Sequence, residues 1–511
     1  MSGSGTITST PADDARVRQA QRLVRTFMDG HGDGTTGVGV LEPVIDLALQ
    51  ADPDVSAAGT SLLFTGVVER LADTFVPRDR RALEQVLARV VTRVRSLPQG
   101  RMLDARLAAW GLVDETDLLT RVDRVAQSND RQSGPGADVG LVFVLSRVTL
   151  GADILLTTSV LQTAARKFPD ADIVFVGDPK HAQLLIGDIE RARVIDAGYG
   201  RRQVVTRRIL AWLSLVDAME EAVTARPRGT RYLVIDLDSR LLQSGVLPAM
   251  PPADEPTDYH FWRGTVSPET RRPAASQGED VVRWLATRFG EDANEAVVSP
   301  RICLSGADDD FAETCRRQWK LEQGSTVVSV NLGVGGNEAK RVSDGSFGAS
   351  LFEQEVVRHL LLDGASVIVD SGAGRTELRR AAEIANVARA EGFCVLGATE
   401  RWMPANADSR RAVGRLLLFE GSVARFAALV RLSDLYIGYD SLGQHIAGAL
   451  GKNIITVFAG YASPLFVSRW KPMSAGVVRT LEVGTGPFSA GRQQQIVADV
   501  LSAYRSLTGG P

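Results

Sequence analysis

The sequence has little lysine and no surplus of positive charge. Only six of its 58 basic residues are lysine, and 61 acidic residues outnumber the basic ones, so the formal net charge at pH 7 is −3. Proteins that bind nucleic acid or an anionic membrane through their overall electric field carry an excess of cations, so this composition argues against both kinds of partner. We therefore expect any phosphate group that the protein binds to be held by a small local site.

Cysteine is scarce, and long apolar runs are absent. The three cysteines, Cys303, Cys315 and Cys394, show no CxxC spacing, which argues against a disulfide framework and against a thiolate zinc site. No stretch approaches the roughly 18 consecutive apolar residues of a membrane-spanning helix, and the first residues lack the pattern of a secretion signal. These absences predict a cytoplasmic protein without membrane insertion.

Histidine is rare as well, with five residues in the chain. Four of them form no HxH, HxxE or HExxH spacing, so we expect no bound metal ion and no other cofactor. These four are His31, His181, His260 and His359.

The sequence does contain enough apolar residues for several hydrophobic cores. Its 511 residues correspond to about three or four domains, and 44% hydrophobic with 23% charged residues is typical of soluble globular proteins. Residues 1–10 are predicted to be a disordered tail, and residues 11–128 an all-α domain in which apolar residues recur at the i, i+3, i+4, i+7 spacing of an amphipathic helix. Residues 129–140, which combine Asn, Asp, Ser, Pro and Gly without a periodic apolar face, are predicted to be a linker, so we expect the helical domain to be separable.

Beyond the linker, short apolar runs alternate with helical patterns, which is typical of βαβ units and a parallel sheet. One series of such runs lies at 139–145, 173–176 and 232–237, and a second lies at 325–332, 367–369, 435–438 and 454–458. The sequence therefore predicts two α/β halves in tandem, residues 141–322 and 323–511, after the all-α domain.

The strongest local signal lies at residues 432–460, where a strand runs into a tight turn and then a helix. Asp440, Ser441 and Gly443 form the turn, and His445 lies one turn into the helix. A helix N-terminus at the carboxyl edge of a parallel sheet presents free N–H groups that can bind a diphosphate. The spacing alone leaves open that Asp440 or Ser441 only caps the helix and that His445 only packs.

Two further segments carry candidate residues. At 327–342 a strand enters a turn with Gly335 and Gly336, followed by Lys340, and this pattern is typical of either a phosphate-binding loop or a solvated loop lysine. At 142–168 a strand and Gly151 precede a helix that we expect to begin at about Asp153. Asp153 could accept a proton from an acceptor hydroxyl, or it could simply cap that helix.

Together these segments resemble the bacterial heptosyltransferases of glycosyltransferase family nine, which have the two-Rossmann GT-B fold. DSLGQHIAGALGKNIITVF is similar to the family's D-[ST]-G-x-x-H signature, except that Leu442 replaces the glycine and Gly443 follows one place later. LGADILLTTSVLQTAARKFPDADIVFV is similar to the family's L-G-D segment, with Ala152 inserted before Asp153. The likeness covers residues 138–475 and implies a GT-B chain preceded by an additional helical domain.

The resemblance implies an inverting glycosyltransferase that uses no metal ion. Asp153 would be the catalytic base, and the donor, a nucleotide-diphosphate sugar such as ADP-heptose, would lie in the second half, with Arg469 or Lys471 also near its diphosphate. The implied donor-binding residues are Gly335, Gly336, Lys340, Glu377, Asp440, Ser441, Leu442, Gly443 and His445.

The acceptor is left open as a natural product, a glycan or a protein. The helical domain would serve homo-oligomer assembly or acceptor docking without taking part in donor chemistry, and the last helix, at about 491–507, would return across the first half. Two alternatives remain: a sugar-nucleotide 2-epimerase on the same scaffold, and a catalytically inactive protein that only binds nucleotide sugars.

Overall fold

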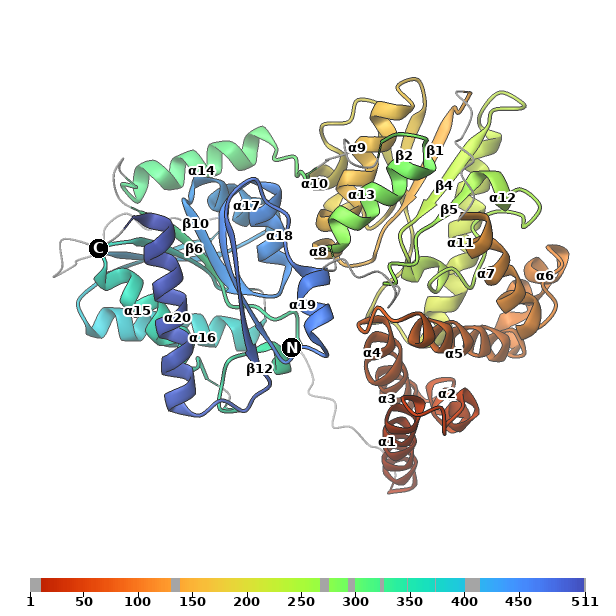
Figure 1. Cartoon of the computed structure of the whole chain (residues 1–511), viewed down its shortest axis with the longest axis horizontal. Coiled ribbons are helices and arrows are strands. Elements are labelled where there is room, and N and C mark those ends of the chain that lie inside the picture. The colour runs from red at the N-terminus through yellow and green to blue at the C-terminus, as the bar shows by residue number, and fades with distance from the viewer. Residues whose placement is uncertain are drawn as a thin grey trace, which may run out of the picture.

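The computed structural model describes residues 11–129, 138–266, 275–292, 299–321, 326–346, 348–372, 374–399 and 414–509. In this part of the chain a helical segment is followed by two α/β domains (Figure 1). We call residues 138–292 the first domain and residues 299–509 the second domain. The predicted tail, residues 1–10, and most of the predicted linker lie outside the described residues. Within the described ranges, no helix combines the length and the apolar character needed to cross a membrane.

The helical segment consists of helices whose first turns carry recognisable start signals. Pro53 and Pro77 each occupy the first position of a helix, where the missing N–H leaves no hydrogen bond unmade. Asp52 caps the first of these two helices, because its carboxylate accepts hydrogen bonds of 3.0 Å from the backbone N–H groups of Asp54 and Val55. The helices are α1 (Pro11–His31), α2 (Glu42–Ala48), α3 (Pro53–Leu63), α4 (Glu69–Ala72), α5 (Pro77–Arg95), α6 (Arg101–Ala109) and α7 (Glu115–Asn129).

The first domain is built on a parallel sheet with the strand order β3-β2-β1-β4-β5. The central strand is buried along its whole length, as expected for a parallel strand covered on both faces. The strands are β1 (Leu141–Leu145), β2 (Asp172–Gly177), β3 (Ala192–Asp196), β4 (Tyr232–Asp236) and β5 (Tyr259–Phe261). The helices are α8 (Leu150–Ala152), η4 (Asp153–Thr157), α9 (Thr158–Lys167), α10 (Ala182–Ile186), α11 (Val205–Thr224), α12 (Glu255–Asp258) and α13 (Gln277–Arg288).

The second domain has a parallel sheet with the order β12-β11-β10-β6-β7-β9-β8. Its strands are β6 (Val327–Asn331), β7 (Ser366–Asp370), β8 (Cys394–Thr399), β9 (Arg415–Glu420), β10 (Leu435–Tyr439), β11 (Asn453–Ala459) and β12 (Val478–Gly484). Its helices are α14 (Gly306–Gln318), η7 (Glu338–Lys340), α15 (Leu351–Leu362), α16 (Arg375–Ala390), α17 (Val423–Leu432), α18 (Leu442–Ala449), α19 (Pro464–Trp470) and α20 (Ala490–Thr508). The strand order changes direction around β6, between β10 and β7, which is where ligands bind in sheets of this kind.

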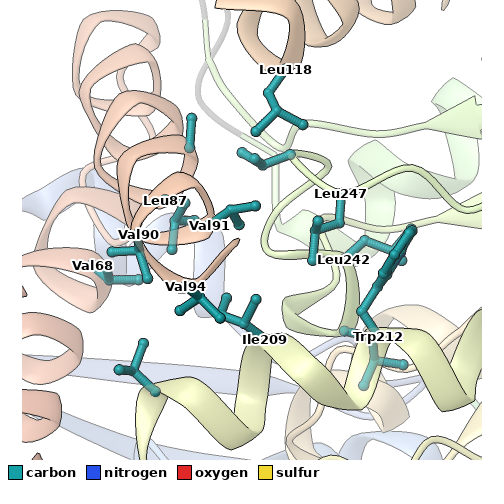
Figure 2. Packing of buried hydrophobic residues seen from close by; sticks show 14 of the residues in the cluster. Val68, Leu87, Val90, Val91, Val94, Leu118, Ile209, Trp212, Leu242 and Leu247 are labelled. Atoms are coloured by element: carbon teal, nitrogen blue, oxygen red, sulfur yellow. The ribbon is translucent and has the colours of Figure 1, made fainter. Parts of the chain in front are cut away.

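The helical segment shares its hydrophobic core with the first domain. Side chains of α5 and α7 lie in one buried cluster with side chains of α11, of β1 and β4, and of the loop that follows β4. Figure 2 shows how closely these elements approach, with Val94 of α5 next to Ile209 of α11. The apolar stripe that the sequence places on a helix is fully buried in this cluster; its residues are Leu83, Val86, Leu87, Val90, Val91 and Val94.

Buried ion pairs join the same two parts of the chain. Arg121 of α7 donates from Nε to Glu255 at 2.7 Å and from a guanidinium nitrogen to the backbone oxygen of Gly245 at 2.7 Å. Arg80 of α5 pairs with Asp238 at 2.5 Å. The described residues of 11–129 are helical, as the periodicity predicts, and their apolar face covers the first sheet. This shared core argues against a separable domain, which stays a prediction to be tested by truncation.

Two helices belong to a different part of the fold from the one predicted. Helix α20 packs on α15 of the second domain, with its buried side chains, among them Ile496 and Tyr504, in the core of that domain (Figure 1). The prediction that the last helix returns to the first half is therefore wrong. Helix α14 precedes the predicted boundary at 322 yet packs on α17, where the Arg425 guanidinium lies 4.7 Å from the centre of the Phe311 ring.

Candidate active site between the two domains

Asp153 lies inside a helix and not at its start. Helices α8, η4 and α9 follow one another without a break from Leu150, so the expected start at Asp153 is wrong by three residues. The carboxylate accepts hydrogen bonds from the Ser146 hydroxyl at 2.7 Å, from the Arg147 backbone N–H at 2.7 Å and from the Thr157 hydroxyl at 2.8 Å. Asp153 therefore does not cap the helix. Its carboxylate instead fixes the turn that follows β1.

The Asp153 side chain lines a cavity of about 230 Å³ in the first domain. Polar groups line other parts of this cavity, including His181, Tyr199 and Arg201. Burial raises the pKa of Asp153 to about 6, although the three hydrogen bonds favour the charged form and oppose this shift. Near neutral pH the group is a carboxylate that is ready to accept a proton.

Helix α18 of the second domain has an N-terminus that no side chain of the described residues caps. Ser441 occupies the N-cap position but makes no capping hydrogen bond. The Asp440 carboxylate is engaged elsewhere, because it accepts hydrogen bonds from Lys340 Nζ at 2.5 Å and from Gln444 Nε2 at 2.7 Å. The capping role that the sequence leaves open is therefore absent for both residues, and the first N–H groups of α18 remain available to an anion.

Tyr436 determines where the glycine of the α18 turn must lie. A Cβ atom on Gly443 would come 2.2 Å from the Tyr436 hydroxyl oxygen, and one on Gly438 would come 2.3 Å from the same atom. The Tyr436 hydroxyl therefore requires glycine at position 443, one place after Leu442, the first residue of α18.

Lys340 reaches this turn from the loop after β6. Gly335 and Gly336 lie in the same loop with φ angles of 60° and 84°, which glycine adopts readily and other residues rarely do. The Lys340 ammonium nitrogen lies 5.1 Å from the centre of the Phe466 ring, in addition to its contact with Asp440. The loop thus places a cation beside the α18 turn, and the solvated-lysine alternative does not describe its surroundings.

His445 is buried beside Lys340 and Asp440. Burial lowers its pKa to about 4, with a smaller contribution from the nearby Lys340 charge, so the imidazole is neutral at pH 7. Its Nδ1 atom is buried and has no hydrogen-bond partner. A neutral ring with one free nitrogen can still donate or accept one hydrogen bond, depending on its tautomer.

Glu377 lies in a second group at the ends of β6 and β7. Its carboxylate accepts a hydrogen bond of 3.2 Å from the backbone N–H of Gly374, and it lines a hollow of about 40 Å³ together with Asn331 and Asp370. Asn331 Nδ2 donates to Asp370 at 2.7 Å, and the Ser441 hydroxyl lies 3.5 Å from Asn331 Oδ1. Asn331 thus connects this hollow to the α18 turn.

The two domains meet where α8 contacts α18. A Cβ atom on Gly151 would lie 3.3 Å from Leu442 Cα and 3.4 Å from His445 Cδ2. Gly151 is two residues from Asp153, so the proposed base and the α18 turn lie on opposite sides of one interdomain contact. Arg469 takes a different role from the one implied: it is buried, pairs with Asp280 at 2.9 Å and donates to the backbone oxygen of Gly264 at 3.1 Å. Lys471 is exposed.

The structure therefore brings Lys340, Asp440 and His445 together and places Glu377 in the neighbouring hollow. Sequence reasoning missed Asn331 and Asp370, although each is the polar last residue of a mostly apolar strand, and this signal could have identified both. It also missed Gln444, which links Asp440 to Thr456 through a hydrogen bond of 2.8 Å. Among the described residues, no group of three or more His, Cys, Asp or Glu side chains could hold a metal ion.

Solved structures with a similar fold exist. A glycosyl transferase family 9 protein from Veillonella parvula matches with a TM-score of 0.50 at 15% identity, over 73% of this chain and 99% of that chain. ADP-heptose LPS heptosyltransferase II from E. coli matches with a TM-score of 0.45 at 16% identity, over 72% of this chain and 98% of that chain. E. coli heptosyltransferase WaaC with ADP-2-deoxy-2-fluoro heptose matches with a TM-score of 0.43 at 15% identity, over 72% of this chain and 99% of that chain. No family model and no curated protein matches the sequence.

The first of these likenesses confirms the two tandem α/β domains of the predicted fold. Two tandem Rossmann-like domains face each other, as the motifs of glycosyltransferase family nine imply, and the likeness spans almost the whole of the Veillonella parvula chain. At this level of identity the likeness concerns the fold alone. What the protein does must be argued from its own site.

Proposed function

We propose that this protein is a glycosyltransferase that moves a sugar from a nucleotide-diphosphate donor to an acceptor hydroxyl, with inversion at the anomeric carbon. The observation that carries the proposal is the contact between α8 and α18 at Gly151, Leu442 and His445. It places a cavity with a buried carboxylate on one side of the domain interface and an uncapped helix N-terminus with a lysine on the other side.

In this proposal Asp153 is the general base. The acceptor oxygen attacks the anomeric carbon, the bond from that carbon to the diphosphate oxygen breaks, and the electron pair leaves with the diphosphate. The acceptor proton passes to the Asp153 carboxylate. A raised pKa of about 6 suits this role, because the group is ionised at pH 7 and is a stronger base than an exposed aspartate.

The leaving diphosphate would be stabilised by groups of the second domain and not by a metal ion. The first N–H groups of α18 and the positive end of its dipole face the place where this charge develops. Lys340 would exchange its contact with Asp440 for one with the diphosphate, and His445 would donate a hydrogen bond. The acceptor would occupy the cavity of about 230 Å³ beside Asp153.

A second candidate function is nucleotide-sugar binding without catalysis. The observation that favours it is that the Asp153 carboxylate already accepts three hydrogen bonds, from Ser146, Arg147 and Thr157. A carboxylate has about four lone-pair positions, so only about one is left to accept the proton that catalysis requires. Turnover in the presence of an acceptor, and its loss on replacement of Asp153, distinguish the two functions.

The proposal predicts that nucleotide sugars raise the melting temperature of the protein, with or without EDTA. A ligand that binds only the folded state adds RT ln(1 + [L]/Kd), or about 2.7 kcal/mol at a hundred times Kd. Thermal unfolding with ADP-, UDP-, GDP- and TDP-sugars measures this stabilisation and identifies which nucleobase of the donor the protein prefers. The absence of stabilisation by every member of the set would contradict the proposed function, and stabilisation abolished by EDTA would contradict metal independence.

Replacing Lys340 or His445 with alanine is expected to weaken donor binding. A charge-assisted hydrogen bond is worth roughly 1.5–3 kcal/mol, so the affinity for the best nucleotide sugar should fall about ten- to a hundredfold for Lys340→Ala, and less for His445→Ala because its ring is neutral. Calorimetry measures both affinities. Lys320→Ala, which removes an exposed lysine elsewhere in the chain, is the matched control. Equal affinity in wild type and both site variants would exclude this diphosphate site.

A further inference from the structure

The turn between α4 and α5, residues 73–76, reaches from the helical segment into the second domain. Phe75 is only 8% exposed and lies in one apolar cluster with Phe458, Phe466 and Val467 of the second domain. Its backbone oxygen accepts a hydrogen bond of 2.9 Å from the N–H of Val266. Phe75 has a φ angle of 57°, a conformation that costs energy for a residue with a side chain, so these contacts must hold it in place.

One ring of the cluster around Phe75 also lies beside Lys340. Phe466 belongs to the cluster around Phe75, and its centre lies 5.1 Å from Lys340 Nζ. A Cβ atom on Gly460 would come within 2.0 Å of the backbone oxygen of Ala339, so the Lys340 loop is also tightly packed against the end of β11. The aromatic cluster that holds Phe75 therefore also includes the ring over which the proposed diphosphate lysine lies.

Asp73, at the start of this turn, adds a carboxylate to the charged groups of the site. The charges that act on it come from Lys340 and Asp440 of the second domain, from Arg240 of the first domain, and from Glu69 on its own helix. Burial raises the pKa of Asp73 to about 6, although the nearby Lys340 favours its charged form. The two positive charges, on Lys340 and Arg240, are balanced by the two negative charges on Asp440 and Glu69. An ionised Asp73 therefore gives these five side chains a net negative charge.

We propose that the turn at residues 73–76 is part of the donor site, where the Asp73 carboxylate, within electrostatic reach of Lys340, selects against the nucleoside diphosphate product in favour of the nucleotide-sugar donor. The inference rests on the proposed function. A nucleotide sugar carries about two negative charges on its diphosphate, and the product carries about three once its terminal phosphate is ionised. Repulsion by one fixed carboxylate grows with the ligand's charge, so it favours release of the product. Phe75 holds the carboxylate in place.

The test measures selectivity between product and donor at pH 8. Calorimetry on the full chain gives Kd for ADP with ADP-glucose, UDP with UDP-glucose, and GDP with GDP-mannose. Asp73→Asn should tighten binding of the nucleoside diphosphate about tenfold and of the matching nucleotide sugar about fivefold, because the repulsion scales with a charge of three against two. Asp73→Glu should keep the wild-type ratio of the two Kd values, nucleoside diphosphate over nucleotide sugar. Phe75→Ala should lower this ratio as Asp73→Asn does, because the Asp73 carboxylate is then no longer held in place.

Two controls separate this effect from a general change in charge or fold. Asp54→Asn removes an exposed carboxylate from the same helical segment and should leave both affinities unchanged. At pH 5 Asp73 is mostly protonated, so Asp73→Asn and wild type should bind alike. If wild type binds nucleotide sugars and Asp73→Asn leaves the ratio at pH 8 unchanged, this inference is overturned while the proposed function stands. If wild type binds none of the six ligands, both are overturned.

Discussion

Replacing Asp153 with asparagine is expected to lower turnover by about two to four orders of magnitude, the usual contribution of a general base. Asparagine keeps the shape of the side chain and can still accept the hydrogen bonds from the Arg147 N–H and the Thr157 hydroxyl. It cannot take a proton from the acceptor. Steady-state turnover of the wild type and the variant, with the donor and acceptor that the wild type uses, measures the loss.

The pH dependence provides a second measurement of the same role. Because Asp153 must be ionised to act as a base, kcat/KM of the wild type should rise as the pH rises through about 6. The control is Asp188→Asn, which removes an exposed carboxylate from the same domain and should keep both the turnover rate and the pH profile of the wild type. Turnover of Asp153→Asn within a few-fold of wild type would exclude Asp153 as the base.

The same substitution should not destabilise the fold at pH 7. The folded-state pKa of Asp153 lies above its unfolded value of 3.8, so the folded protein binds this proton more tightly and loses stability as the pH rises from about 4 to about 6. This shift in the pKa corresponds to roughly 3 kcal/mol. The neutral amide avoids this cost, so the variant should unfold at the same or a higher temperature than wild type while it turns over far more slowly.

The local structure of the candidate site follows closely from the sequence. The strand before Asp440 ends at Tyr439, one residue beyond its predicted end, and the helix begins at Leu442 within the predicted turn. Such transitions are local, because apolar alternation, a polar turn and small helical residues lie within a dozen positions. For the same reason, Lys340, Asp440 and His445 could be proposed as one group once the motifs were recognised.

The long-range contacts could not be predicted from the same signals. Periodicity identifies the apolar face of α5 correctly but does not say which surface that face covers, and it covers the first sheet. The carboxylate of Glu255 lies 134 positions from its partner Arg121. Phe75 stands in the short turn at residues 73–76, and nothing in its neighbours predicts that it joins a cluster of the second domain with Phe466. Each of these contacts depends on the topology of the whole chain.

Removing the helical segment is expected to prevent folding, and this reverses the expectation from the sequence. A chain that begins at residue 138 would expose the apolar side chains of the first domain that α5 and α7 cover, each worth about 1.5–3 kcal/mol. It would also remove Arg121 and Arg80, the arginines that pair with Glu255 and Asp238 of the first domain. These losses exceed the 5–15 kcal/mol that stabilises a typical domain.

The experiment compares the truncated chain with a chain that is cut but complete. A protease site placed after Gly136 breaks the covalent connection and removes no residue, so the two pieces should remain associated through the shared core and elute together on gel filtration. The truncated chain should be insoluble or lack a cooperative thermal transition. If residues 138–511 instead fold alone with the thermal stability of wild type, then the cluster around Val91 and Trp212 contributes little to stability. Nucleotide-sugar binding by such a fragment, with unchanged selectivity over the product, would also remove Asp73 from the donor site, because that carboxylate would be missing.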